Sequence, residues 1–214
     1  MVSVRPGQEP GAGGGTARDG GAQDGERRPR KDAARNRAAL LAAADDLFAR
    51  CEKPEDVTMS DVAAAAGVGK GTLFRAFGDR TALIRALYEA RLEPLKQAVT
   101  EGPPPLGPAT PPRERVPALL DAALCFKLDH RHLALALEGA DSPYEAEHYA
   151  QWHALLSGML ATVPGITDGD FTAHALLATV RADLVEHLAG TRGLGREELR
   201  ARLGEFVERV LGGG

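Results

Sequence analysis

Residues 58–80 read TMSDVAAAAGVGKGTLFRAFGDR, and this stretch decides the fold. Thr58 and Asp61 have the spacing of a capping box, which predicts that a helix begins directly after Thr58. Gly67 ends that helix, because glycine takes the left-handed conformation at a helix C-terminus without strain. Lys70–Phe77 is predicted to form a second short helix. Two short helices joined by a glycine-containing turn predict a helix-turn-helix, the motif that presents its second helix to the major groove of DNA.

Longer helices are predicted on both sides of this motif. Apolar residues repeat at helical spacing from Leu40 to Phe48, which predicts an amphipathic helix from about residue 32 to about residue 50. Gly78 begins the next turn, and Asp79 is expected to cap a long helix that is kinked or ended at Pro94. The apolar residues of the second short helix that are expected to pack against these neighbours are Leu73, Phe74 and Phe77.

Composition divides the chain of 214 residues into three parts. Residues 1–30 hold eight glycines and almost no large apolar side chains, so we expect a disordered tail. Residues 31–92 form the helix-turn-helix domain. A loop at Glu101–Pro112, with six of the 14 prolines, lies near the start of a helical domain over residues 93–214. No segment alternates like a strand, so the predicted fold class is all-α. The expected C-terminal helices are 113–128, 130–140, 144–162, 168–190 and 196–211.

The formal net charge of -4 conceals an asymmetry along the chain. Residues 1–91 carry 15 Lys and Arg against 13 Asp and Glu, whereas residues 92–214 carry 11 against 17. Six basic residues and one acid lie between Arg27 and Arg37. A basic run just before a helix-turn-helix is the footprint of a polyanion binder, although a solubilising tail is the alternative. We therefore expect double-stranded DNA as a partner.

Several other classes of protein are disfavoured. No window approaches 18 consecutive apolar residues and no apolar run marks a signal peptide, so we expect a cytoplasmic protein without a membrane partner. Cys51 and Cys125 suit two free thiols in a reducing cytosol. The glycine-rich run at residues 67–72 lacks the order and the preceding strand of a phosphate-binding loop. Without a nucleophile–base pair or a cofactor fingerprint, we expect no enzyme and no cofactor.

The histidines give no sign of a metal site in the sequence. All six lie in the C-terminal half, and none belongs to an HExxH motif or another tight ligand set. His148 and His153 are five positions apart, which does not place them on one helical face. We therefore expect no metal site.

The second helix of a helix-turn-helix turns its first residues toward base edges. Gly69 and Gly71 lack side chains, so the backbone can approach DNA closely. Lys70 can reach a guanine edge or a phosphate, and Thr72 can reach a phosphate or a thymine methyl group. Arg75 follows Thr72 by one turn, which is expected to place both on the same face. The alternative is that these side chains are merely solvated.

Two further residues are predicted to contact phosphates. Thr58 begins the supporting helix, where its hydroxyl and the helix-terminal amides can face a phosphate. Arg80 stands at the head of the next helix, where the helix dipole disfavours a cation. A phosphate partner explains that placement better than helix stability does.

Residues 33–92 resemble the DNA-binding domain of the tetracycline-repressor (TetR) family of bacterial regulators. The family pattern Ala-Gly-Val-x-x-Gly-Thr-Leu-(Tyr/Phe)-x-x-Phe appears here from Ala66 to Phe77. The Leu-Phe that ends the family's first helix is Leu47-Phe48 here. The chain has Gly69 where the family often has Ser. It has Phe74 at a DNA-facing position where Tyr, with a phosphate-binding phenol, is commoner.

The resemblance implies that residues 93–214 bind an unknown small-molecule effector and form a homodimer through the last two helices. The apolar residues of these two helices are spaced 3-4-4 and 4-3-4 along the chain, which suits a packed helix–helix interface. The alternative is that they form an intramolecular core. The residues expected at the dimer interface are Leu177, Val180, Leu184, Leu188, Leu199, Leu203, Phe206 and Val210.

An apolar pocket between helices is the expected effector site, with His153 or Glu138 as its polar group. The same side chains can instead be ordinary core. The residues expected to line the pocket are Phe126, Leu133, Leu137, Tyr149, Trp152, His153, Leu155 and Met159.

Together these features predict a ligand-responsive transcriptional regulator, a repressor that holds a palindromic operator as a dimer and releases it when the effector binds. One alternative is a family member that binds small molecules without binding DNA, against which Lys70, Thr72 and Arg80 argue. A less favoured alternative is a helical enzyme.

Overall fold

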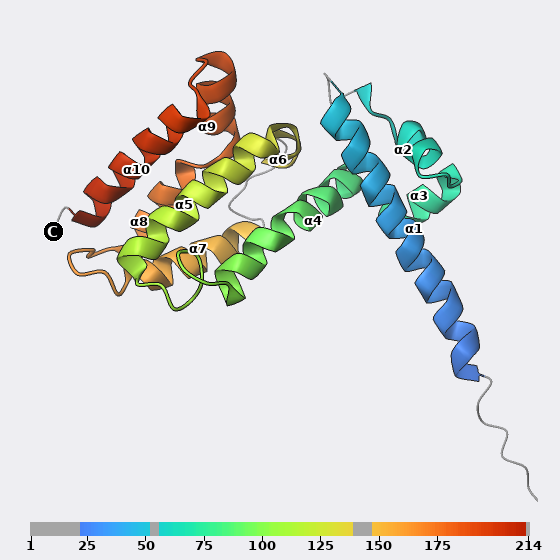
Figure 1. Cartoon of the computed structure of the whole chain (residues 1–214), viewed down its shortest axis with the longest axis horizontal. Coiled ribbons are helices and arrows are strands. Elements are labelled where there is room, and N and C mark those ends of the chain that lie inside the picture. The colour runs from blue at the N-terminus through green and yellow to red at the C-terminus, as the bar shows by residue number, and fades with distance from the viewer. Residues whose placement is uncertain (1–21, 52–55, 139–146, 213–214) are drawn as a thin grey trace, which may run out of the picture.

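A computed structural model describes residues 22–51, 56–138 and 147–212, and Figure 1 shows their arrangement. The described residues contain helices and no strand, which confirms the all-α prediction. None of their helices is both long and apolar enough to span a membrane. The N-terminal helices are α1 (Ala22–Arg50), α2 (Met59–Ala65), α3 (Lys70–Phe77) and α4 (Arg80–Glu101). The C-terminal elements are α5 (Pro112–Asp129), α6 (Arg131–Glu138), α7 (Glu147–Leu160), α8 (Gly169–Ala178), α9 (Ala182–Glu186), the π-helix η3 (His187–Thr191) and α10 (Arg196–Gly212).

Local chemistry places α2 and α3 where the sequence predicts them. The Thr58 side chain accepts a hydrogen bond from the Asp61 amide, and the Asp61 side chain accepts one from the Thr58 amide, so the capping box is confirmed. Gly67 and Gly78 have φ values of +67° and +80°, which only glycine adopts readily. Asp79 caps α4 by accepting a hydrogen bond of 2.8 Å from the Ala82 amide.

The first four helices share one apolar core. α1 and α4 cross, and α2 and α3 pack against α1 on the side away from the C-terminal helices (Figure 1). The buried side chains at the centre of this cluster are Leu40, Ala44, Val62, Leu73 and Leu83.

α1 begins earlier than the sequence predicts. It starts at Ala22, so residues 22–30 of the expected disordered tail are helical, while residues 1–21 lie outside the described residues. Apolar periodicity could not signal this extension, because its residues are mostly polar. Gln, Glu, Arg and Lys are good helix formers, and they extend a helix that is anchored further along the chain.

α4 joins the two halves of the molecule as one helix. It continues through Pro94 to Glu101, so of the two expected outcomes at Pro94, a kink or an end, the end is wrong. Leu92 is buried in the first core and Val99 in a second core, while Leu95 packs against both. Burial on both sides of the proline outweighs the hydrogen bond that proline removes. The predicted domain boundary at residue 92 therefore falls inside a continuous helix.

The second core lies among α5, α7, α8 and α10. α7 lies against α8, and α10 lies against α5 (Figure 1). The side chains there with less than 2% exposure include Val116, Leu120, Leu156, Leu160, Leu176 and Val207. The expected helix at 168–190 is interrupted after Ala178. There Thr179 donates its hydroxyl to the Leu176 carbonyl instead of continuing the helix.

Arg91 connects the first four helices to the C-terminal ones. Its guanidinium forms an ion pair with Asp45 on α1, and its Nη1 lies 3.1 Å from Nδ1 of His130, at the corner between α5 and α6. Leu133 and Ala134 of α6 are buried in the first core. The junction between the two halves is therefore polar at Arg91 and apolar beneath α6.

His130 makes this junction sensitive to pH. Burial, and then the nearby Arg91 cation, lower the pKa of His130 below its ordinary value. The unfolded chain therefore takes up more protons than the folded chain as the pH falls below about 6.5, and folding stability falls with it. We expect His130→Gln to reduce the loss of stability between pH 7 and pH 5, measured by urea unfolding. His132→Gln, at an exposed neighbour, is the control, and equal pH dependence in all three proteins would contradict this account.

Candidate nucleic-acid interface

α3 is held by one face and exposes the other. Leu73 and Phe77 have 0% and 8% exposure and pack into the first core. Arg75 is exposed on the opposite side, Lys70 is exposed at the first residue of the helix, and Phe74 is 50% exposed. The prediction that Phe74 packs back is therefore wrong. Leu73 and Phe77, four residues apart, fill the inward face, and Phe74 lies about 100° around the helix.

The first turn of α3 is open to an anion. Its N-cap residue is Gly69, which provides no side-chain hydrogen bond, and its first turn contains no acid. The first amides of a helix have no partner within the helix and carry partial positive charge. A phosphate placed there would receive hydrogen bonds from the backbone.

Two of the four glycines around α3 are not required by the fold. Gly67 and Gly78 need a positive φ, but Gly69 has an ordinary φ of -70° and Gly71 lies within the helix. A Cβ added at Gly69 or Gly71 would meet no atom within 4 Å. Glycine at these two positions therefore leaves the backbone open to a partner from outside the chain.

Thr58 and Arg80 have partners within the chain. The Thr58 hydroxyl donates a hydrogen bond of 2.6 Å to Asp61 Oδ2, so its donor is already used in the capping box. Arg80 donates from Nε to the Val57 carbonyl at 3.3 Å, and its guanidinium lies 5.7 Å from the centre of the Phe48 ring. These contacts explain a cation at the start of α4 without a phosphate. The helix dipole is therefore no longer an argument that Arg80 contacts DNA.

Arg37 has a role that the sequence does not reveal. It donates from Nη1 to the Ala76 carbonyl at 2.8 Å, and its guanidinium lies 4.3 Å from the centre of the Phe77 ring. It therefore fastens the C-terminal end of α3 to α1. The remaining predicted contacts lie on α3 itself, with Thr72 half-buried and Arg75 donating to the Gly71 carbonyl at 3.2 Å.

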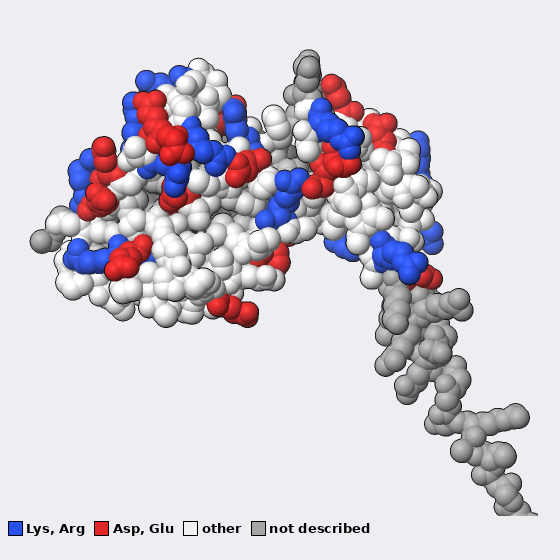
Figure 2. All heavy atoms as spheres, viewed as in Figure 1, with Lys and Arg blue, Asp and Glu red and all other residues white. Residues whose placement is uncertain are grey.

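Charge alone does not mark this surface. On the face shown in Figure 2, Lys and Arg side chains are scattered over the lobe of α1 to α3, and no continuous basic patch is visible. Hydrogen bonds from Thr58 stabilise the ionised carboxylate of Asp61, which lies near Lys70, and thereby lower its pKa. The argument for DNA recognition therefore depends mainly on how α3 is presented.

A cavity of about 80 Å³ lies between α4, α5, α7 and α8. Three predicted pocket residues line it, namely Phe126, Tyr149 and Trp152. Its polar groups are mainly basic, and burial, followed by the nearby Arg181, lowers the pKa of Lys127 to about 8. The other side chains that line the cavity are Tyr88, Leu92, Leu95, Leu119, Leu120, Ala123, His148, Leu177 and Val180.

The other predicted pocket residues lie elsewhere. Leu133 and Leu137 pack in the first core, whereas Leu155 and Met159 pack in the second core. His153 lies against α8. The Glu138 side chain is outside the described part of the chain.

The predicted dimer residues fall into two groups. Val180 and Leu199 are both 5% exposed within the chain's own core, and Leu177 lines the cavity. Leu184 and Phe206 are 38% and 37% exposed. An apolar groove contains this second group, and its lining includes Leu184, Leu188, Leu199, Leu203 and Phe206. Val210 is half-buried and packs against the second core.

The N-terminal helices and the exposed face of α3 define a helix-turn-helix protein of the DNA-binding class. Residues 40–87 match the model of a family described as bacterial regulatory proteins, tetR family. The helix-turn-helix segment of the chain is therefore similar to this family, as its sequence motifs predict.

One curated relative and two solved structures show how far the similarity extends. The HTH-type transcriptional regulator SAR0097 of Staphylococcus aureus (strain MRSA252) is 35% identical over 68 residues, which cover 32% of this chain and 36% of that protein. The match therefore spans about a third of that relative. A TetR-like transcriptional regulator from Rhodococcus sp. RHA1 matches 84% of this chain and 97% of its own, with 21% identity and a TM-score of 0.58. NalD is the secondary repressor of the MexAB-OprM multidrug efflux pump in Pseudomonas aeruginosa. Its structure matches 83% of this chain and 96% of its own, with 21% identity and a TM-score of 0.56.

Gly71 allows DNA contact to be separated from folding. Gly71→Ala should raise the free energy of unfolding by up to about 1 kcal/mol, because alanine is the better helix former. It should also weaken DNA binding, because the new methyl group stands where the backbone approaches the duplex. Thermal unfolding and fluorescence anisotropy with a duplex selected from random DNA measure the two effects.

Gly67→Ala is the matched control for the added methyl group. Because Gly67 has a positive φ, alanine at this position should lower the free energy of unfolding by roughly 1–2 kcal/mol. If the Gly71→Ala protein is more stable and binds DNA as tightly as the wild type, the backbone at Gly71 does not approach the duplex.

Proposed function

We propose that this protein is a ligand-responsive transcriptional regulator that binds DNA as a homodimer through α3. The observation that carries the proposal is the exposed first turn of α3, with no side-chain cap and with glycines that the fold does not require. The match of residues 40–87 to the tetR family of bacterial regulatory proteins supports it. A bacterial transcriptional regulator acts on DNA in the cytoplasm, so we propose a cytoplasmic location. We propose no enzymatic activity.

Repression is the proposed direction of control. NalD, which shares this fold, is a repressor, and we extend that role to the present chain. A dimer that occupies its operator would block transcription until an effector binds. The effector would favour a conformation in which the two α3 helices no longer fit successive turns of the groove.

The cavity suggests how an effector acts on α3. At about 80 Å³ it is smaller than the roughly 300–1,000 Å³ of typical ligand pockets, so an effector would have to push its walls apart. Tyr88, Leu92 and Leu95 form one wall, and all three belong to α4. Only two residues separate the end of α3 from the start of α4, so displacement of this wall would move α3.

The apolar groove between α9 and α10 supports a homodimer. Apart from Arg202 its exposed side chains are apolar, in contrast with the mixed charges over α5 and α10 in Figure 2. Burial of such a groove against its copy would create a symmetric interface. Two α3 helices per dimer would then read two half-sites of a palindrome.

Two substitutions of the same kind separate dimerisation from DNA reading. Phe206→Glu places a charge in the groove and should give a monomer by analytical ultracentrifugation. DNA affinity should fall roughly 100-fold or more, because the second half-site is lost. Phe74→Glu places the same charge on α3 and should abolish DNA binding while leaving the dimer intact.

The two outcomes test different parts of the proposal. A dimeric Phe206→Glu protein would place the interface elsewhere. If the Phe74→Glu protein binds DNA as tightly as the wild type, α3 does not contact DNA.

A further inference from the structure

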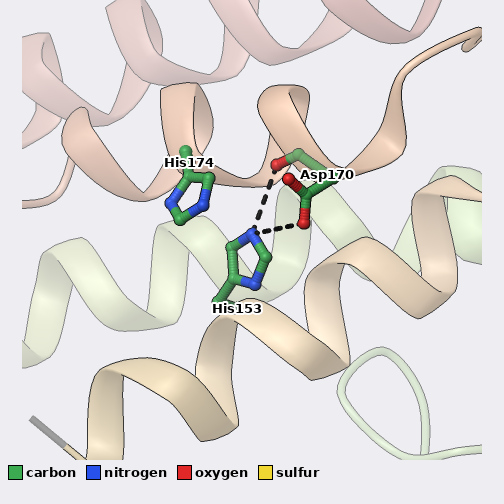
Figure 3. Close-up of side chains that lie close together, drawn as sticks. All are labelled: His153, Asp170 and His174. Atoms are coloured by element: carbon green, nitrogen blue, oxygen red, sulfur yellow. Dashed lines mark hydrogen bonds and ion pairs between the residues drawn. The ribbon is translucent and has the colours of Figure 1, made fainter. Parts of the chain in front are cut away.

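Two histidines and a carboxylate meet where α7 lies against α8 (Figure 3). His153 projects from α7, and Asp170 and His174 project from α8. Asp170 and His174 are four residues apart, which places both on one face of α8. One nitrogen from each imidazole and one carboxylate oxygen all lie within 4.8 Å of one another. This is the one such group of at least three metal-ligating side chains in the described part of the chain.

The spacing fits the ligands of a metal ion. His153 Nε2 lies 3.4 Å from Asp170 Oδ1, and it donates a hydrogen bond of 3.2 Å to the Asp170 main-chain oxygen, which an ion bound to Nε2 would replace. Two ligands bound to zinc at about 2.0–2.1 Å with a tetrahedral angle lie about 3.4 Å apart. The His153 and His174 rings stack with their centres 3.9 Å apart, so both imidazoles lie at the same position between α7 and α8.

Tyr149 orients the second histidine. Its hydroxyl lies 2.6 Å from Nδ1 of His174 and holds that side of the ring. A histidine that binds a metal usually has its other nitrogen held by such a partner. The Asp170 side chain is 74% exposed, so an ion can reach the cluster from solvent. Asp170 is also free of the capping role in α8, which Asp168 performs.

We propose that His153, Asp170 and His174 form a binding site for a divalent transition-metal ion, with zinc as the best match. Two imidazoles and one carboxylate are ligands that zinc accepts, and a water molecule completes the four positions. The ion joins α7 to α8. Because Tyr149 also lines the cavity, the ion fixes one of the cavity walls.

The sequence gives no sign of this site, since its ligands come from two helices and only Asp170 and His174 have helical spacing. The expectation of no metal site considered spacing within single segments. The proposal does not depend on DNA binding, so it and the proposed function can fail separately.

Calorimetric titration of the full chain with Zn²⁺ tests the proposal. Co²⁺ is the spectroscopic substitute, and Trp152, the one tryptophan of the chain, lies next to His153 and reports the titration through quenching. We expect one ion per chain, visible absorption from bound Co²⁺ and quenching of Trp152. His174→Gln and Asp170→Asn should abolish all three, and the exposure of Asp170 makes the second variant safe for folding.

Two further variants sharpen the result. Tyr149→Phe removes only the hydroxyl and should weaken binding roughly 10- to 100-fold, the usual effect of losing a partner of a ligand. The double variant His132→Gln/His187→Gln removes two exposed histidines elsewhere and should bind like the wild type. Absence of stoichiometric binding to the wild type, or unchanged binding by Asp170→Asn and His174→Gln, would overturn the proposal.

Discussion

Burial of Leu73 and Phe77 beneath α3 is the interaction on which the proposed DNA surface depends. A helix of eight residues is unstable alone, because helix nucleation is costly. Burying each of these side chains contributes about 1.5–3 kcal/mol, which is enough to hold such a helix in place. Once they face inward, helical geometry turns Gly71 and Arg75 outward, with Phe74 beside them. Arg37 then fixes the far end of α3 by covering the Phe77 ring and bonding to the Ala76 carbonyl.

α4 gives this surface a possible means of control. The helix begins beside α3, crosses the first core, passes Pro94 without ending and enters the second core. Its middle forms a wall of the cavity, and Arg91 connects it to α1 and to the α5–α6 corner. A rigid element shared by two cores transmits displacement, whereas a flexible linker would absorb it. In the proposed function, a change in the cavity would therefore reach DNA without contact between the effector and α3.

Features set by near neighbours in the chain could be predicted from sequence. The capping box at Thr58, the left-handed Gly67 and the cap at Asp79 each depend on residues within four positions, and all are confirmed. Features that depend on packing between distant segments could not be predicted from the sequence. Pro94 stays within a helix because of two cores that the sequence does not place, and Arg80 finds partners on segments 23 and more residues away. The cavity shows the same limit, since aromatic character identified Phe126 and Trp152, but only tertiary packing assigns Leu133 to another core.

Selection of bound sequences from a pool of random duplex DNA tests most directly whether paired α3 helices read DNA. The purified full chain should enrich an inverted repeat whose half-site centres lie about 10 base pairs, or a multiple of one helical turn, apart. An asymmetric motif would contradict the symmetric dimer. A pool without enrichment would contradict sequence reading by α3 altogether.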